Sequence, residues 1–175
     1  MDKKRLFLVV AVFWLVIFLL FIVNQEYTKR TGEEVLLETE PIDPRDLFRG
    51  DYVILNYKIN RLEAGKFGLN TSNIEEDDEV FLSLYTEEGY GKPKEFALEE
   101  PDEDLYIKGN VESVWRDSLE INYGIGIYFI PEGEGELLEN SEDLDVKVFI
   151  DERGNAVIDY LLIEGEKVDF SGESS

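Results

Sequence analysis

The sequence predicts a mostly β protein, in which one N-terminal transmembrane helix precedes a mostly antiparallel β barrel or curved sandwich with one short helix. Three observations support this fold class. A run of 18 apolar residues extends from Leu6 to Val23. Segments of strand length with alternating apolar and polar residues follow it, separated by turn sequences. The regular alternation of strands and helices that is typical of α/β proteins is missing.

The apolar run has the length and flanking charge of a membrane anchor. As a helix, residues 6–23 would span about 27 Å, close to the hydrocarbon core of a bilayer. Lys3, Lys4 and Arg5 precede the run, so the positive-inside rule places the N-terminus in the cytoplasm. A cleaved signal peptide would have a shorter apolar region ending in small residues. We therefore expect an uncleaved, single-pass signal anchor in the cell membrane, with the lipid bilayer as the partner of residues 6–23.

The anchor divides the chain into parts with different surroundings. We expect a basic cytoplasmic stub (1–5), the anchor (6–23), a tether (24–32), an extracytoplasmic β domain (33–170) and a disordered tail (171–175). The chain carries 17 basic and 40 acidic residues, a net charge of −23. This surplus favours a soluble, self-repelling surface and argues against nucleic acid as a partner.

Composition also excludes several kinds of chemistry. The chain has no histidine and no cysteine, which excludes disulfides, thiol catalysis, thiolate metal sites and the Ser-His-Asp triad. We expect no catalytic residues, no cofactor and no metal site.

Apolar periodicity places the remaining elements in order along the domain. The expected strands are residues 33–40, 51–59, 78–86, 95–100, 105–114, 118–130, 144–151 and 156–170. A glycine-rich and polar segment, 61–73, is expected to be a loop that can include one helical turn, and 131–141 is the one expected helix outside the anchor. In the strand at 51–59, Val53, Leu55, Tyr57 and Ile59 share one face.

The stretch DPRDLFRGDYVILNY, residues 43–57, has the features of a capped turn that leads into a strand. Asp43 suits a helix N-cap, Pro44 the first helical position, and Asp46 a capping-box carboxylate. Gly50 suits a residue that leaves the turn with positive φ. The alternative is an Arg–carboxylate network or a cation or ligand site, because the charged side chains cluster at Asp43, Arg45, Asp46, Arg49 and Asp51.

Two segments resemble a known family. GDYVILNY, residues 50–57, has all five defining positions of the signature that names the GDYxxLxY family. Residues 41–49 resemble its P-x-D-P-R-D-x-x-R lead-in, and residues 123–135 resemble its pattern Y-G-I-x-x-Y-F-x-P-E-G-x-G, with Glu139 as the acid that follows. The candidate site residues are therefore Asp43, Arg45, Asp46, Arg49, Gly50, Asp51, Tyr52, Leu55, Tyr57, Tyr123, Gly124, Tyr128, Pro131, Glu132, Gly133 and Glu139.

The resemblance implies a membrane-anchored outer domain and a membrane protein as partner, without supplying an activity. We expect the two matched segments to touch, with Arg45 or Arg49 paired to Glu132 or Glu139. A likeness to type I signal peptidases fails, because Pro41 stands where their nucleophilic serine would be.

These features favour a non-enzymatic, membrane-anchored protein whose outer domain binds another membrane or envelope protein. Two alternatives stay open: an extracytoplasmic hydrolase that uses carboxylates, and a sensor module that binds a small ligand or a cation.

Overall fold

The fold is mostly β, as the sequence predicts. The computed structural model describes residues 2–40, 52–68, 71–131, 138, 141 and 143–170. Its helices are α1 (Lys3–Thr31), α3 (Ala64–Phe67) and the 3-10 turn η1 (Thr71–Asn73). Its strands are β1 (Glu33–Glu38), β2 (Tyr52–Ile54), β3 (Arg61–Glu63), β4 (Glu79–Glu87), β5 (Tyr90–Ala97), β6 (Tyr106–Val114), β7 (Ser118–Asn122), β8 (Ile127–Phe129), β9 (Leu144–Ile150), β10 (Ala156–Ile163) and β11 (Glu166–Lys167).

Nine of the strands in the described part of the chain form one sheet, in the order β11-β10-β9-β1-β5-β4-β6-β7-β3. The β1–β5 pair is parallel and the other neighbours are antiparallel. Strands β2 and β8 form a separate antiparallel ribbon, the β2–β8 ribbon. Over the described residues the large sheet ends at β11 and β3, so the fold is an open curved sheet and the closed-barrel alternative is wrong.

One apolar core joins the large sheet to the β2–β8 ribbon. Val53, Leu55, Tyr57 and Ile59 are all buried, which confirms the predicted inward face of residues 51–59. They belong to the same core cluster as residues of β1, β4, β6, β7, β9 and β10. The ribbon therefore covers part of the core that the curved sheet encloses.

Several predicted element bounds differ from the structure. The strand expected at 51–59 is regular only over Tyr52–Ile54, and the one expected at 118–130 divides into β7 and β8. Gly124 lies between β7 and β8 with φ +75°, a left-handed conformation that glycine adopts without strain, and the chain leaves the large sheet there. The segment expected as a loop at 61–73 contains the short helix α3, which agrees with the helical turn allowed there, and also strand β3, which was not expected. The helix expected at 131–141 and the tail at 171–175 lie outside the described residues, apart from positions 131, 138 and 141.

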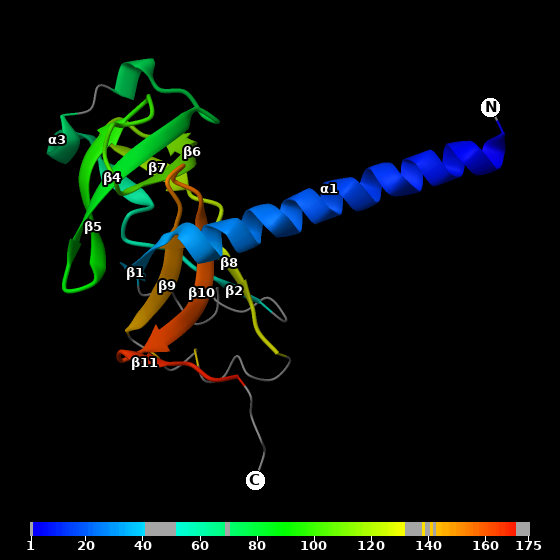
Figure 1. Cartoon of the computed structure of the whole chain (residues 1–175). Helices are drawn as coiled ribbons and strands as arrows, with labels where there is room; N and C mark the ends of the chain where they lie inside the picture. Colours follow the sequence, from blue (N-terminus) through cyan, green and yellow to red (C-terminus); the bar gives the residue numbers. More distant parts are fainter. Residues whose placement is uncertain are drawn as a thin grey trace, which may run out of the picture.

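Helix α1 continues beyond the apolar run and docks on the domain (Figure 1). The expected tether, 24–32, is helical as far as Thr31. Thr28 is buried, and its hydroxyl donates a hydrogen bond to the carboxylate of Asp151, with 2.7 Å between the oxygens. Tyr27 donates to Glu152 at 3.1 Å, and Lys29 lies 3.7 Å from Asp159. We call this contact between α1 and the β9–β10 hairpin the joint.

Asp151 is the centre of the joint. Its carboxylate also accepts hydrogen bonds from the backbone N–H groups of Arg153 (3.0 Å) and Asn155 (2.9 Å). Burial raises the pKa of Asp151, but the hydrogen bonds from Thr28 and Asn155 outweigh it and leave the pKa below its usual value. At Gly32, where α1 ends, a Cβ would stand 2.6 Å from the Thr28 carbonyl oxygen, so this close approach requires glycine.

We expect Thr28→Val to loosen the joint. The substitution keeps the shape of the side chain but removes a donor from a buried carboxylate, which should cost about 1–3 kcal/mol of the free energy of unfolding. Thr31→Val is the matched control, because the Thr31 hydroxyl is exposed and bonds only within α1; its effect should stay within about 0.5 kcal/mol. Denaturant unfolding of the full chain in detergent micelles measures both.

The hydrogen bond between Thr28 and Asp151 also predicts that the stability of the protein depends on pH. Because the folded-state pKa of Asp151 is depressed, its stabilising contribution is present above the unfolded pKa of about 3.9 and is lost as pH falls through the folded value. The stability difference between wild type and Thr28→Val should therefore be full at pH 7 and shrink below about pH 4. A difference that is independent of pH would contradict the role given to the Asp151 carboxylate.

Candidate functional site

The structure brings the two family-like segments together, as the sequence predicts. Tyr52 pairs with Phe129, and Ile54 with Ile127, across the β2–β8 ribbon. Beyond the ribbon, the Leu55 N–H donates to the Gly126 carbonyl at 2.8 Å. The segments are thus joined by backbone hydrogen bonds along a continuous stretch.

Two buried tyrosines tie these segments reciprocally. The Tyr57 hydroxyl donates to the Ile125 carbonyl at 2.8 Å, and the Tyr123 hydroxyl donates to the Ile59 carbonyl at 2.9 Å. Each tyrosine therefore bonds the carbonyl two residues beyond the other. Burial raises the pKa of both phenols, so they remain protonated donors at neutral pH. We call this pair the tyrosine clasp, and its role is structural.

Leu55, Pro131 and Tyr128 are further site candidates within the described residues. Leu55 is buried in the core, and Pro131 is exposed. Tyr128 is half-buried with its ring 6.1 Å from that of Phe170, and burial, with a smaller effect from Asp159, raises its pKa.

The remaining candidates lie outside the described residues, and their pairing stays a prediction. They are Asp43, Arg45, Asp46, Arg49, Gly50, Asp51, Glu132, Gly133 and Glu139.

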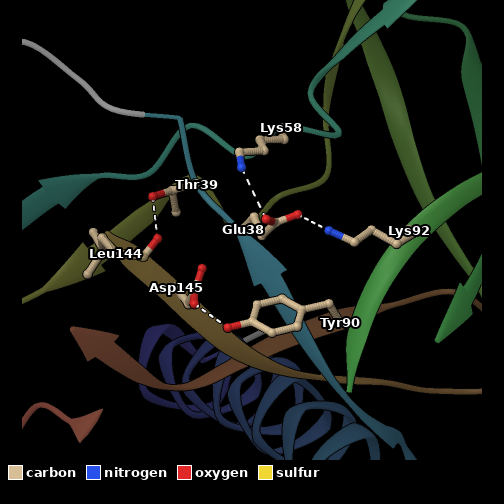
Figure 2. Close-up of polar contacts among 7 residues, drawn as sticks. All are labelled: Glu38, Thr39, Lys58, Tyr90, Lys92, Leu144 and Asp145. Atoms are coloured by element: carbon tan, nitrogen blue, oxygen red, sulfur yellow. Dashed lines mark hydrogen bonds and ion pairs between the residues drawn. The ribbon is translucent and has the colours of Figure 1, made fainter. Parts of the chain in front are cut away.

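A polar groove at the end of β1 was not predicted from the sequence. Figure 2 shows Glu38 between Lys58 and Lys92, with Tyr90 pointing at Asp145. The Lys58 ammonium lies 3.1 Å from Glu38, and the Tyr90 hydroxyl donates to Asp145 at 2.6 Å. A groove of about 500 Å³ is lined by Glu38, Thr39, Lys58, Tyr90, Asp143, Leu144, Asp145, Glu164 and Gly165. We refer to it as the polar groove.

Hydrogen bonds and charge set the protonation states in this groove. The hydrogen bond from Lys92 lowers the pKa of Glu38, with burial opposing it and Lys58 adding to it. The hydrogen bond to Asp145 raises the pKa of Tyr90 to about 12. Glu38 is therefore neutralised by two lysines, whereas Asp143 and Glu164 at the rim are exposed. Among the described residues, no group of three or more acidic side chains is placed to hold a metal ion.

The outward face of the β2–β8 ribbon is apolar. Its inward side chains, Val53 and Tyr128, pack on the core. Its four outward side chains are Tyr52, Ile54, Ile127 and Phe129, which we call the apolar quartet. Phe129 is 77% exposed and Ile127 is 56% exposed, although the outward face of an antiparallel ribbon is ordinarily polar. The Tyr52 and Phe129 rings form an edge-to-face pair with centroids 6.2 Å apart.

We expect Tyr57→Phe and Tyr123→Phe each to destabilise the domain by about 1–3 kcal/mol, because each change leaves a buried backbone carbonyl without its donor. Tyr85→Phe is the control: Tyr85 is exposed, and its change should stay within about 0.5 kcal/mol. Denaturant unfolding of the single and double variants measures these costs. A wild-type midpoint in the double variant would show that the clasp is dispensable.

Comparison with known proteins agrees with the residues that form the clasp and the ribbon. The sequence profile of the family described as "GDYXXLXY protein" matches residues 14–161, which include most of α1 and the strands from β1 to most of β10. No curated protein sequence and no solved structure matches the chain. Because the match covers well over half of the sequence and contains both segments that the clasp joins, the chain belongs to the GDYXXLXY protein family.

Proposed function

We propose that this protein is a single-pass, membrane-anchored binding module whose outer domain engages another membrane or envelope protein. Within the described residues, α1 is the one helix that is long and apolar enough to cross a membrane. Lys3, Lys4 and Arg5 precede its apolar run and favour a cytoplasmic N-terminus in the cell membrane.

The observation that carries the proposal is the joint. Thr28 is only five residues beyond Val23, where the apolar run ends, and it is already buried against Asp151. The domain is therefore held at a fixed height and rotation relative to the anchor. A module fixed in this way loses less orientational freedom when it meets a second membrane-bound protein than one on a flexible linker. This arrangement suits recognition of a partner in the same membrane.

The polar groove is the surface that we assign to the partner. Its rim carries Asp143 and Glu164, both exposed, and the whole chain has a net charge of −23. A positively charged outer segment of a partner would be attracted over a long range and oriented by this field. We therefore propose a partner whose contacting segment is rich in lysine and arginine.

Affinity capture from native membranes tests this assignment. The tagged full chain, cross-linked and extracted in mild detergent, should recover one protein reproducibly, and higher salt during cross-linking should lower the yield. The double change Asp143→Lys with Glu164→Lys should lower recovery at least tenfold, on the order of 1.4 kcal/mol of binding free energy.

The matched control changes the charge equally at the opposite end of β4 and β5. Glu76 and Glu99 are exposed and lie near the ends of these strands that are remote from Tyr90. Glu76→Lys with Glu99→Lys should retain the partner. Repeated recovery of the chain alone would sink the binding proposal, and equal losses in both double variants would remove the groove assignment.

A further inference from the structure

We infer that the apolar quartet rests in the interfacial layer of the bilayer that holds α1, so that the domain contacts lipid at a second place besides its anchor. The inference deepens the proposed function and rests on its membrane anchoring. It assigns a ligand, the lipid surface, to a face that the core does not use.

The first argument is composition. A ribbon that only covered the core would need apolar residues on its inward face alone, and Val53 and Tyr128 supply these. All four outward positions are nevertheless apolar, in a chain in which 33% of residues are charged. Among the described residues, nothing covers Phe129 or Ile127 sufficiently to bury them. A clustered apolar face of this kind indicates a contact with a membrane or another apolar surface.

The second argument is position, and it selects lipid. Gln25 of α1 lines the same surface hollow as Ile127 and Phe129. Gln25 lies two residues beyond Val23, about 3 Å farther along the helix axis. The interfacial layer extends about 5–7 Å beyond each side of the hydrocarbon core. Figure 1 shows β8 near the end of α1 that joins the domain, in agreement with the hollow that Gln25 shares with Ile127 and Phe129.

The third argument is that the joint keeps the quartet at this depth. Thr28 and Lys29 follow Gln25 on α1 and contact Asp151, in the turn before β10, and Asp159, within β10 itself. The hollow that Gln25 shares with β8 also includes Ala156, Val157 and Ile158 of β10. The same strand thus contacts the helix and flanks the quartet, so rotation of α1 away from β8 would break the buried Thr28–Asp151 hydrogen bond.

The chemistry of the contact is apolar. An acidic domain is repelled by anionic headgroups, but the quartet carries no charge, and the neighbouring Lys29 is paired with Asp159. Aromatic side chains are favoured at the membrane interface, and the quartet contains Tyr52 and Phe129. Because α1 already holds the domain at the surface, insertion is an intramolecular step with a high effective concentration. The contact should form on zwitterionic lipid and persist at high salt.

The absence of cysteine gives a direct test with the full chain. Single-cysteine variants at Phe129, at Phe18 within the apolar run and at Leu98, a 48% exposed apolar residue directly after β5, are spin-labelled and reconstituted in phosphatidylcholine vesicles. Collisions with oxygen report lipid, and collisions with a water-soluble nickel chelate report water. The labels at 129 and 18 should collide more with oxygen, and the label at 98 more with the chelate, at both low and high salt. Ile127→Cys repeats the quartet measurement in case Phe129→Cys disturbs the ribbon.

The label at position 18 separates the two proposals. Lipid at 18 with water at 129 and 127 overturns the lipid contact and leaves the anchor in place. Water at 18 overturns both. A label at 129 and 127 that is shielded from both reagents shows that protein covers the quartet, which also overturns the lipid contact.

Discussion

The buried hydrogen bond from Thr28 to Asp151 is the constraint on which the arrangement of the molecule depends. Together with the Tyr27–Glu152 and Lys29–Asp159 contacts, it fixes how the apolar helix meets the β domain, so that each face of the domain has a defined relation to the helix. A buried aspartate is costly unless its oxygens are satisfied. Here the β9–β10 turn supplies donors from Arg153 and Asn155, and α1 supplies the hydroxyl of Thr28. The turn alone therefore lacks one of the donors to the Asp151 carboxylate, and α1 supplies it. This requirement gives the joint its specificity.

The tyrosine clasp plays the corresponding role inside the domain. The segments around Tyr57 and Tyr123 are far apart in the chain, and the ribbon between them, β2–β8, is too short to be stable alone. Two reciprocal hydroxyl–carbonyl bonds, together with the burial of Leu55, hold the ribbon against the core. This explains why the described tyrosines of the GDYxxLxY-like stretch have different positions. Tyr57 is buried and bonds the neighbouring segment, whereas Tyr52 lies on the outward face of the ribbon.

The sequence predicts the parts of this structure that depend on local pattern. The apolar run, the mostly β composition and the inward face shared by Val53, Leu55, Tyr57 and Ile59 follow from spacing alone, and the structure confirms them. The polar groove could not be predicted, because Glu38 meets Lys92 only through the parallel pairing of β1 with β5. These two strands are far apart in the sequence, and no local pattern indicates that they pair. The joint was missed because residues 24–32 have no apolar periodicity; one hydroxyl, that of Thr28, makes the buried contact. The apolar quartet was not predicted, because residues 118–130 were expected to form one long strand without the turn at Gly124.

The joint, the groove and the quartet together give the domain a direction relative to the membrane. Strand β1 starts at Glu33, directly after the helix, and reaches Glu38 about 17 Å along the strand axis. The acidic groove therefore begins well away from the helix, whereas the quartet shares a hollow with Gln25 at its base. The polar groove and the apolar quartet are thus different surfaces of the domain, and of the two hollows only the one beside the quartet includes a residue of α1. Anionic headgroups repel the acidic surface, and the interfacial layer favours the apolar quartet. Both effects favour the same orientation, in which the polar groove is open to a second protein.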